Sequence, residues 1–262
     1  MNVFVFDIET VPDVENARRL WGLEELDDDG VAAVMYSKRQ QETGGATDFI
    51  RHHLHRIVAI AAAFREDDRL KLWSLGEEDS SEEELVRRFF EGVERYSPTL
   101  VSWNGSGFDL PVLHYRAMLH GIAAPRYWDT GEEDRSFRYN NYLGRFHWRH
   151  IDLMDVLAGY QARAFAPLDQ MASILGFPGK MGMTGADVWD YYRAGKIKAI
   201  RAYCETDVLN TYLVFLKFQH MRGHLQDTQL RRELEQVQDF LASSEHPHLQ
   251  EFLSAWNAAS SL

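Results

Sequence analysis

The apolar residues of this chain gather in short runs that predict β-strands. Residues 2–8 and 56–64 are two such runs, and their content of Val, Ile, Ala and Phe is typical of well-buried strands. Residues 70–75 alternate apolar and polar side chains, as a strand at a sheet surface does. The acidic stretch 66–68 between the second and third runs predicts a hairpin turn. A further strand is expected at 99–103.

Helical periodicity fills much of the rest of the chain. Ser81 followed by Glu84 is a capping-box pattern, and it predicts a helix that ends before Pro98. A second helix is expected at 110–119, with Gly121 just past its end. Farther along the chain, apolar residues at helical spacing predict helices at 153–163, 167–176, 186–194, 197–221, 228–242 and 247–258.

Composition narrows the class of protein that these elements can build. The 262 residues are 45% hydrophobic, which is enough for one large α/β domain with a buried core. A net charge of −12 argues against a basic coat protein for nucleic acid, but it leaves open an enzyme that uses divalent ions. With one cysteine, Cys204, no intrachain disulfide is possible, and no apolar run approaches the ~20 residues of a spanning helix. We expect a soluble, cytoplasmic protein with no membrane partner.

Two acids stand at the end of the first apolar run. Side chains of a strand alternate between two faces, so Asp7 and Glu9 point one way, while Phe6 and Ile8 point the other way into packing. At roughly 4 Å and an effective dielectric near 20, two carboxylates repel by about 4 kcal/mol. A cation or a shared proton must relieve that repulsion. Because a run this apolar is typical of a central strand, the pair is predicted to form the floor of a metal site.

Two later segments carry further acids, and each also has a purely structural explanation. Asp109 follows a glycine turn that begins at Asn104, at the junction of a strand and a helix, and an isolated Asp in that place is more often a helix cap. Asn104 is itself a common turn residue. Tyr203 and Asp207 are four residues apart in a predicted helix and share one face, which also suits an ordinary amphipathic surface.

Taken in order, the three segments resemble the motifs of the DEDD superfamily of 3′–5′ exonucleases, in its tyrosine-bearing branch. Segments 6–10, 104–109 and 203–207 are most similar to the motifs of the proofreading domain of family B DNA polymerases. The chain as a whole resembles the small bacterial family of predicted polymerase-B-like 3′–5′ exonucleases, over most of residues 1–220. The length leaves no room for a polymerase palm and fingers, so the resemblance implies a free-standing exonuclease.

The resemblance implies an α/β fold of the RNase H-like class, which is a mixed β-sheet flanked by α-helices. The exonuclease domain would span residues 1–222, with an irregular insertion at about 11–50 that holds a short helix. Residues 223–262 would form a C-terminal helical extension packed on the same domain. Neither the insertion nor the extension carries a motif that assigns it a role.

The resemblance also implies two divalent ions, Mg²⁺ or Mn²⁺, for which carboxylate oxygens are suitable ligands. The implied ligands are Asp7, Glu9, Asp109 and Asp207. Tyr203 and Glu9 would orient the attacking water, although a tyrosine with its ordinary pKa near 10 is a poor base. The implied or expected substrate contacts are Thr10, Asn104, Phe108, Lys180, Arg138 and Arg145.

Segment 137–150 interleaves arginines with aromatic residues, and two explanations stay open for it. Single-stranded nucleic acid is gripped by such a pattern, through stacking and phosphate contacts. A packed β-hairpin with arginine stems lying over aromatic rings would have the same composition. Just beyond this segment, Asp152 is predicted to be a helix cap with Asp155 in the first turn, rather than a further acid of the site.

Two other groups of residues invite a ligand but have simpler explanations. Lys180 lies in a glycine-rich loop that lacks the spacing of a phosphate-binding Walker motif, so an exposed lysine with at most one phosphate contact is expected. His52, His53 and His55 have no cysteine near them and precede an apolar strand. A solvated turn is therefore favoured over a zinc site.

The leading hypothesis is an enzyme, a 3′–5′ exonuclease that acts on the 3′ end of single-stranded DNA and releases nucleoside 5′-monophosphates. An RNA-processing exonuclease of the same superfamily is the alternative, because a metal site does not read the 2′-hydroxyl. A non-catalytic module that binds nucleic acid or protein comes next, and the presence of all four acids and the tyrosine disfavours it. A structural protein comes last, because it requires three motif-like segments in order by coincidence.

Overall fold

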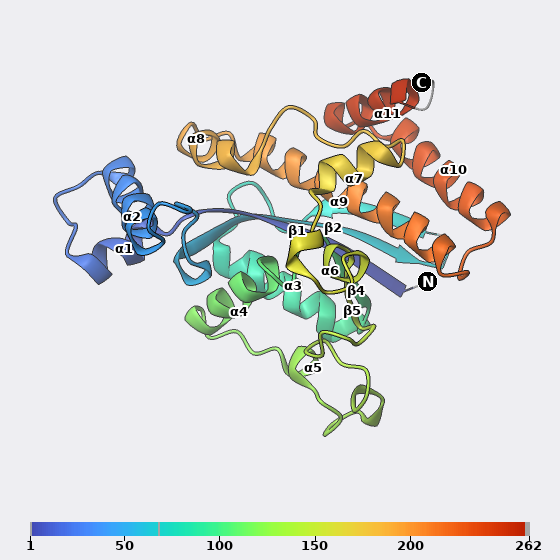
Figure 1. The fold of residues 1–262 in the computed structure, drawn as a ribbon, viewed down its shortest axis with the longest axis horizontal. Coiled ribbons are helices and arrows are strands. Elements are labelled where there is room, and N and C mark those ends of the chain that lie inside the picture. The colour runs from blue at the N-terminus through green and yellow to red at the C-terminus, as the bar shows by residue number, and fades with distance from the viewer. Residues whose placement is uncertain (1, 68, 260–262) are drawn as a thin grey trace.

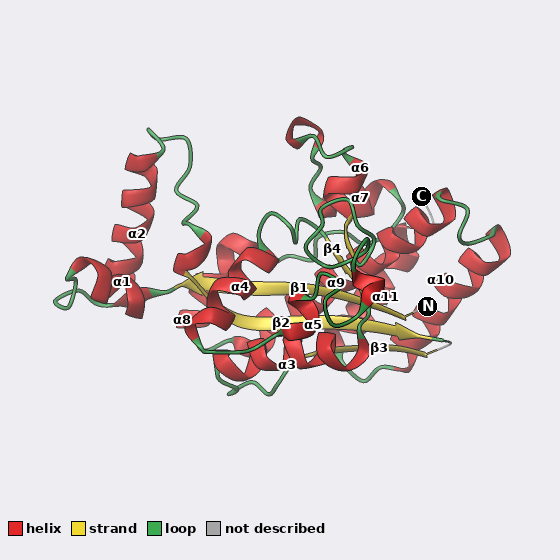
Figure 2. Ribbon diagram, turned by 90° about the horizontal axis from the view of Figure 1, so that it is seen from below, coloured by secondary structure: helices red, strands yellow, loops and turns green. Residues whose placement is uncertain are grey.

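The computed structural model describes residues 2–67 and 69–259, and its centre is one five-stranded sheet of order β3-β2-β1-β4-β5 (Figures 1 and 2). β2 is antiparallel to β1 and β3 to β2, whereas β4 is parallel to β1 and β5 to β4. This mixed sheet, flanked by helices, is the predicted RNase H-like α/β fold. Asp68, in the predicted hairpin turn, lies outside the described residues. The strands are β1 (Asn2–Pro12), β2 (His55–Glu66), β3 (Arg69–Ser74), β4 (Thr99–Ser102) and β5 (His150–Asp152).

Helices cover both faces of the sheet (Figure 1). One face is covered by α9 (Ile197–Met221) with α7 (Leu168–Ile174) beside it. The other face is covered by α3 (Glu82–Tyr96) and α4 (Asp109–Leu119). The remaining helices are α1 (Val14–Trp21), α2 (Asp28–Glu42), α5 (Pro125–Trp128), α6 (Leu153–Leu157), α8 (Val188–Arg193), α10 (Asp227–Ser243) and α11 (Pro247–Ala259).

β1 is the central strand, and its side chains alternate between two hydrophobic cores. Phe4, Phe6 and Ile8 lie in the core on the α3 face, whereas Val3 and Val5 lie in the core on the α9 face. Full burial of an apolar side chain of this size contributes roughly 1.5–3 kcal/mol. The register of β1 is therefore fixed by both cores, because a slip of one residue would exchange all of these side chains.

Most of the predicted helix boundaries are confirmed, and one is corrected. Ser81 caps α3 by accepting a hydrogen bond from the Glu84 N–H, and α3 ends before Pro98. The helix expected at 153–163 is wrong, because α6 ends at Leu157. Gly159 and Tyr160 follow with positive φ angles of 59° and 61°, a conformation that a helix cannot contain.

Segment 137–150 is not a β-hairpin. It consists of turns up to His150, the first residue of β5. The Asn141 carboxamide explains these turns, because its oxygen accepts hydrogen bonds from the Leu143 and Gly144 N–H groups. The expected stacking of arginine on rings is present, since the Arg149 guanidinium lies 3.6 Å from the centroid of the Phe137 ring.

The insertion at residues 11–50 holds two helices, α1 and α2, rather than one short helix. Both views show them at one end of the sheet and extending beyond it (Figures 1 and 2). The acidic stretch 27–30, which suggests a break in structure, is instead the N-cap and first turn of α2. The Asp27 carboxylate accepts a hydrogen bond from the Gly30 N–H at 2.8 Å, and acids are favourable at a helix start.

A buried ion network ties the insertion to the sheet. Arg116 of α4 donates to Asp13, at the start of α1, and to Glu82 of α3, and all three side chains are buried. The Glu82 carboxylate also accepts a hydrogen bond from the Ile57 N–H of β2 at 2.6 Å. Removing one partner of a buried pair typically costs about 3–5 kcal/mol, so this network holds the insertion firmly against the domain.

The two C-terminal helices pack on α9 and the sheet. Leu241 of α10 and Phe252 of α11 are buried in the core that α9 shares with β1. The buried Arg65 guanidinium of β2 pairs with Glu233 of α10 at 2.7 Å. The division of the chain near residue 222 stays a prediction. Among residues 2–67 and 69–259, no helix combines the length and the apolar character needed to cross a membrane.

Candidate active site

The side chains of β1 that face α9 include two acids. Val5 precedes them in the core on the α9 face, and Val11 follows them in a cluster with α8. Asp7 and Glu9 lie between these apolar contacts, with carboxylate oxygens within 4.8 Å of each other. The predicted pairing of the two acids on one face of a central strand is therefore what the structure shows.

A β-bulge lies beside this pair. Glu9 pairs with Ala59 but Thr10 pairs with Ile57, so β2 has one extra residue at this point. Bulges re-aim side chains and are frequent next to functional sites. The Thr10 hydroxyl lies 2.8 Å from Nδ1 of the buried His55. Burial lowers the pKa of His55 to about 4, so Thr10 has a neutral imidazole as its partner near pH 7.

Asp109 reaches the site from the first residue of α4. The structural alternative for Asp109, a helix cap, does not apply, because the N-cap is Phe108 and the Asp109 carboxylate makes a different contact. It accepts a hydrogen bond from the Ile8 N–H of β1 at 3.2 Å. That bond crosses between β1 and α4 and holds a buried carboxylate beside Asp7 and Glu9.

The turn before Asp109 is braced by Asp152. Its carboxylate accepts hydrogen bonds from the N–H groups of Asn104 and Ser106, both at 2.9 Å, and also from the Asp155 N–H. The predicted cap at Asp152 is therefore confirmed, and the same carboxylate also fixes the motif turn. Asn104 has a φ of 66°, in line with its prediction as a turn residue.

Tyr203 and Asp207 come from one face of α9. The Tyr203 phenol lies close enough to the Asp207 carboxylate for each group to shift the pKa of the other. Asp207 is close enough to Asp7 and Glu9 to disfavour their charged forms. Three separate segments thus bring four carboxylates and a phenol together. Glu9 and Asp109 are buried, whereas Asp7, Tyr203 and Asp207 are partly buried, so the cluster opens to solvent on one side.

All four carboxyl groups have raised pKa values. Burial is the main cause for Asp7 and Glu9, whose pKa values lie well above the usual range, and repulsion from the neighbouring carboxylates adds to it. Burial also raises the pKa of Asp109 to about 7 and that of Asp207 to about 6. The Tyr203 pKa is raised by burial and then by Asp207, so the phenol stays protonated. The cluster is electrostatically strained at neutral pH.

Two further residues of the cluster were missed by sequence reasoning. Cys204, noted only as a lone cysteine, is buried and donates its thiol to the Asp7 carbonyl at 3.3 Å and to Asp7 Oδ2 at 3.5 Å. Asp169 of α7 lies near Asp207 and disfavours its charged form. Spacing from Asp7 or Asp207 in the sequence could not have identified Asp169, because only the packing of α7 on α9 brings it close.

Lys180 lies near the cluster, on a loop that α9 fixes. The Asn210 carboxamide of α9 donates to the Gly179 carbonyl at 2.8 Å and accepts from the Gly179 N–H at 3.2 Å. Gly179 has a φ of 65°, and a Cβ there would lie 2.8 Å from the Asp169 carbonyl oxygen, so only glycine fits. Lys180 is exposed, and its charge lowers the pKa of Asp207.

The two arginines expected to contact substrate lie in different surroundings. Arg145 makes two 2.7 Å hydrogen bonds with the buried Asp155 carboxylate, so its charge is already paired. It lines a hollow of about 500 Å³ that also includes Asn104. Arg138 is exposed and lies over the ring of Tyr139, outside that hollow. A role for either arginine in substrate binding stays a prediction.

The histidines near residue 53 do not gather as metal ligands. His52 Nε2 lies 2.8 Å from the Gly107 carbonyl oxygen, and exposed His53 packs against the ring of Tyr115. His55 is buried, so the predicted solvated turn is wrong for this residue. Within the described part of the chain, the one group that fits a metal ion combines Asp7, Glu9 and Cys204.

A slot of about 590 Å³ opens directly beside Glu9 and Thr10. Its walls come from β1, from the end of the insertion and from the region of α8. Aromatic rings are frequent in these walls, and Phe49 lies 5.5 Å from Phe108 between ring centroids. No lysine or arginine lines the slot, whereas Glu9, Asp48 and Asp190 do. We call it the base slot.

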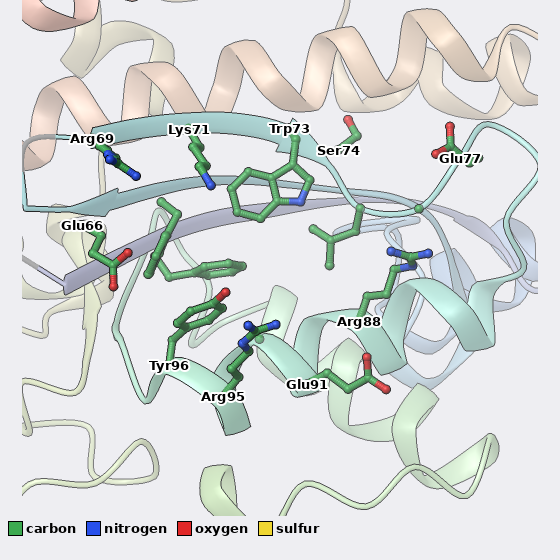
Figure 3. A pocket seen from close by; sticks show the side chains of 15 residues that line it. Glu66, Arg69, Lys71, Trp73, Ser74, Glu77, Arg88, Glu91, Arg95 and Tyr96 are labelled. Atoms are coloured by element: carbon green, nitrogen blue, oxygen red, sulfur yellow. The ribbon is translucent and has the colours of Figure 1, made fainter.

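A second hollow, of about 580 Å³, lies on the other face of the sheet between β3 and α3 (Figure 3). It contains none of the residues that the sequence assigned to a site. Trp73 and Tyr96 contribute exposed rings to it, and Lys71 and Arg95 contribute cations. We call it the edge groove.

The residues present in the acid cluster fit hard divalent cations. Carboxylate oxygens, which Mg²⁺ and Mn²⁺ prefer, come from Asp7, Glu9, Asp109 and Asp207. Burial and mutual repulsion disfavour the charged forms of these acids, so a bound cation would stabilise those forms. The Cys204 thiol is protonated and hydrogen-bonded to Asp7, so it is suited to orienting that carboxylate rather than to binding a hard ion.

Comparison with known families supports this picture. The model of a family described as predicted 3′–5′ exonucleases related to the exonuclease domain of PolB matches residues 47–256. The matched range includes Asp109, Tyr203 and Asp207, and it begins after β1, so Asp7 and Glu9 lie outside it. Nuclease chemistry and a nucleic-acid substrate are what such a family indicates. With most of its length matched, the chain belongs to the family of predicted 3′–5′ exonucleases related to the PolB exonuclease domain.

Proposed function

We propose that this protein is a metal-dependent 3′–5′ exonuclease. It hydrolyses the phosphodiester bond at the 3′ end of single-stranded DNA and releases a nucleoside 5′-monophosphate. The observation that carries the proposal is the cluster of four carboxylates, which three separate chain segments bring together in a partly buried site. A cluster of like charges with raised pKa values is costly unless positive charge completes it.

Two divalent ions would complete the site. Asp7, Glu9, Asp109 and Asp207 would hold them, and the bound ions would supply Lewis-acid stabilisation to the attacking and leaving oxygens of an in-line displacement. The protein contributes a fixed frame for this charge. The Ile8 N–H holds the Asp109 carboxylate, and the Cys204 thiol holds that of Asp7, so the acids are oriented before any ion binds.

Tyr203 would position the attacking water rather than remove its proton. Its raised pKa keeps the phenol protonated at neutral pH, so it can donate a hydrogen bond but cannot act as a base. Tyr203 lies one helical turn before Asp207 on the same face of α9, which holds the phenol beside the cluster. A Tyr203→Phe variant should therefore lower kcat while leaving the binding of Mg²⁺ or Mn²⁺ intact.

The base slot suits the base of the 3′-terminal nucleotide. Its walls carry aromatic rings and carboxylates but no lysine or arginine, so they repel a phosphate and accept a neutral, planar, polar group. Phe49 is 52% exposed and can stack against a base. Glu9 belongs both to this slot and to the acid cluster, so a base in the slot has its phosphate next to the acids.

The fixed insertion supports a preference for unpaired ends. Its start is held by the Arg116 network, and the chain just after it is held where His52 Nε2 lies 2.8 Å from the Gly107 carbonyl oxygen. Arg193 of α8 pairs with Asp28 of α2 at 2.7 Å, which joins the insertion to the helix whose first turn lines the slot. A terminal base stacked on Phe49 is enclosed by these elements, and a complementary strand would compete for the same space.

The deciding experiment is digestion of 3′-labelled and 5′-labelled DNA and RNA oligonucleotides with Mg²⁺, Mn²⁺ or EDTA. We expect stepwise shortening from the 3′ end with either metal, mononucleotide products and no reaction in EDTA. Paired and unpaired 3′ ends in parallel reactions test the strand preference, and the RNA arm tests the alternative substrate. A lack of cleavage with both metals would overturn the proposal.

A further inference from the structure

The edge groove lies on the sheet face opposite the acid cluster. β3 is an edge strand, because β2 is its only neighbour in the sheet. Leu70 and Leu72 pack on the α9 side, and the Ser74 hydroxyl donates to Glu205 of α9 at 2.7 Å. Strand alternation therefore places Lys71 and Trp73 on the α3 side, where they line the groove.

Aromatic rings form the floor of the edge groove. The Trp73 ring meets the buried Phe4 ring edge-on, with centroids 6.1 Å apart, and Tyr96 meets Phe64 at 5.0 Å. Trp73 and Tyr96 remain 37% and 39% exposed, although their partners are buried. Core residues thus pack against one side of each of these two rings, and part of each ring stays accessible to a ligand (Figure 3).

Cations from both walls flank these rings. Arg69 and Lys71 come from β3, and Arg88 and Arg95 come from α3. Figure 3 shows Lys71 and Arg95 extending from opposite walls toward the space beside Trp73. Among the described residues, no carboxylate forms an ion pair with Arg69, Lys71 or Arg95, and Arg88 pairs only with exposed Glu84.

Three acids also line the groove, namely Glu66, Glu77 and Glu91. Glu84 balances Arg88, so three unpaired cations face three carboxylates, and the groove is close to neutral on a chain whose net charge is −12. Unpaired surface cations beside exposed rings add little to folding stability, because each stays solvated. Their arrangement is better explained by a ligand that carries both a planar π face and negative charge.

The spacing of the cations favours a chain of phosphates over a single one. Two residues along a strand separate Arg69 and Lys71 by about 7 Å. Seven residues along a helix separate Arg88 and Arg95 by about 10 Å. A site for one phosphate gathers its cations at a point, whereas these follow the two walls.

Gly92 keeps the groove open. It lies within α3, where glycine costs roughly 0.5–1 kcal/mol relative to alanine. A Cβ at this position would meet only the Phe4 ring, at 3.9 Å, which is an ordinary contact. Packing therefore does not require glycine here, and a side chain at this position would enter the groove that Gly92 lines.

We propose that the edge groove is a second binding site for single-stranded nucleic acid, with a base stacked on Trp73 and phosphates beside Lys71 and Arg95. It is separate from the acid cluster and needs neither metal nor cleavage. An exonuclease with such a site retains its strand while the 3′ end leaves the acids between cleavage steps. The groove walls supply stacking and charge, which are the two contacts that grip single strands without regard to sequence.

The test measures the affinity of the full chain for a fluorescein-labelled oligothymidylate in EDTA. Fluorescence anisotropy reports the binding at several salt concentrations. Trp73→Ala should weaken binding about tenfold. Lys71→Glu with Arg95→Glu should weaken it further and lower the slope of log K against log salt by about 2. Gly92→Leu should fill the groove and weaken binding while favouring the helix.

Two matched variants control for indirect effects. Trp128→Ala removes a ring of α5 that is more exposed than Trp73, at 51% against 37%. Arg87→Glu reverses the charge next to Arg88 on α3 but outside the groove. Both should bind strands as the parent does. Wild-type affinity in Trp73→Ala, or competition by free thymidine monophosphate as effective as by the oligonucleotide, would overturn the proposal. Because no cleavage occurs in EDTA, a failed exonuclease assay would leave this result standing.

Discussion

The two faces of the central sheet carry opposite chemistry. On the α9 face, four carboxylates gather in a partly buried cluster, whereas on the α3 face cations and aromatic rings line an open groove. The same alternation produces both, since β1 sends Asp7 to one face and Phe4 to the other. Carboxylates that are buried together raise one another's pKa values and require a cation. Exposed lysine and arginine side chains stay solvated until a ligand binds. Each face can therefore be disabled separately.

The largest effect should come from removing one acid of the cluster. Asp7→Ala or Asp207→Ala should lower metal-dependent nuclease activity by at least about a hundredfold, because the stabilisation of the reacting phosphate depends on the complete set. Initial rates on a 3′-labelled oligonucleotide, with circular dichroism to check the fold, measure this.

The matched control is Asp79→Ala, which removes an exposed carboxylate from the turn after β3. It should leave the rate within about twofold, as ordinary surface substitutions do. If Asp7→Ala retained activity at the parental level, the cluster would not be the catalytic site.

A metal ion should stabilise the acid face without affecting the edge groove. At about 100 times its dissociation constant, one bound ion adds roughly 2.7 kcal/mol, which raises the melting temperature by several degrees in a chain of this size. Thermal unfolding with Mg²⁺, Mn²⁺ or EDTA measures the shift. Asp7→Ala should lose it, and an equal rise in that variant would place the ion elsewhere.

The base slot gives the next largest expected effect. Phe49→Ala should raise KM for single-stranded DNA about tenfold and change kcat little, because it removes stacking from the terminal base and leaves the acids in place. The preference for unpaired over paired 3′ ends should fall as well. Steady-state kinetics on both substrates measure these quantities.

Leu20→Ala is the control for the slot. Leu20 lies in the same insertion with 57% of its surface exposed, comparable to Phe49, but it does not line the slot. Unchanged kinetics in Phe49→Ala would exclude the slot as the base site while leaving the exonuclease assignment intact.

The last effect concerns the acid cluster alone and should appear in the pH dependence of stability without metal. The pKa of Asp109 in the folded protein is about 7, above the ~3.9 of an exposed aspartate, so the folded state binds more protons between these values. Stability from this group is present at low pH and is lost as the pH rises from about 4 to about 7. The Asp109→Asn variant should not lose stability from this position as the pH rises, because asparagine does not titrate.

The measurement is the difference in melting temperature between Asp109→Asn and wild type across that pH range in EDTA. It should grow in favour of the variant by up to about 4 kcal/mol, or several degrees, because one pKa unit corresponds to about 1.36 kcal/mol. Taking the difference cancels the buried His55, His114 and His150, whose pKa values burial lowers to about 4. A constant difference would show that Asp109 is not strained.

Sequence patterns identified the parts of the site that depend on local periodicity. The alternation in residues 2–8 was enough to place Asp7 and Glu9 on one face, and the four-residue spacing was enough to pair Tyr203 with Asp207. The order of the three segments, compared with a known superfamily, supplied Asp109. Taken alone, this residue is as well explained by a helix cap, and the contact with the Ile8 N–H across two elements could not be read from the sequence.

The missed features depend on contacts between distant segments. Asp169 approaches Asp207 because α7 packs on α9, and the Arg116 network joins α1, α3 and α4. The edge groove depends on which face of β3 meets which face of α3. Two other differences have local causes. The acidic N-cap of α2 resembles a segment that interrupts secondary structure, and the Asn141 turns exclude the hairpin that was one of two explanations for segment 137–150.

The Arg116 network has a consequence for how the molecule opens. Asp13 and Glu82 share the buried guanidinium of Arg116. If the insertion moved away from the domain, Arg116 would lose one of its two partners and would remain in the interior with an incompletely paired charge, which is costly. The insertion should belong to the same cooperative folding unit as the sheet. Amide hydrogen exchange near Ala17 should therefore be as slow as in β1. The rate of turnover should not be limited by opening and closing of the insertion.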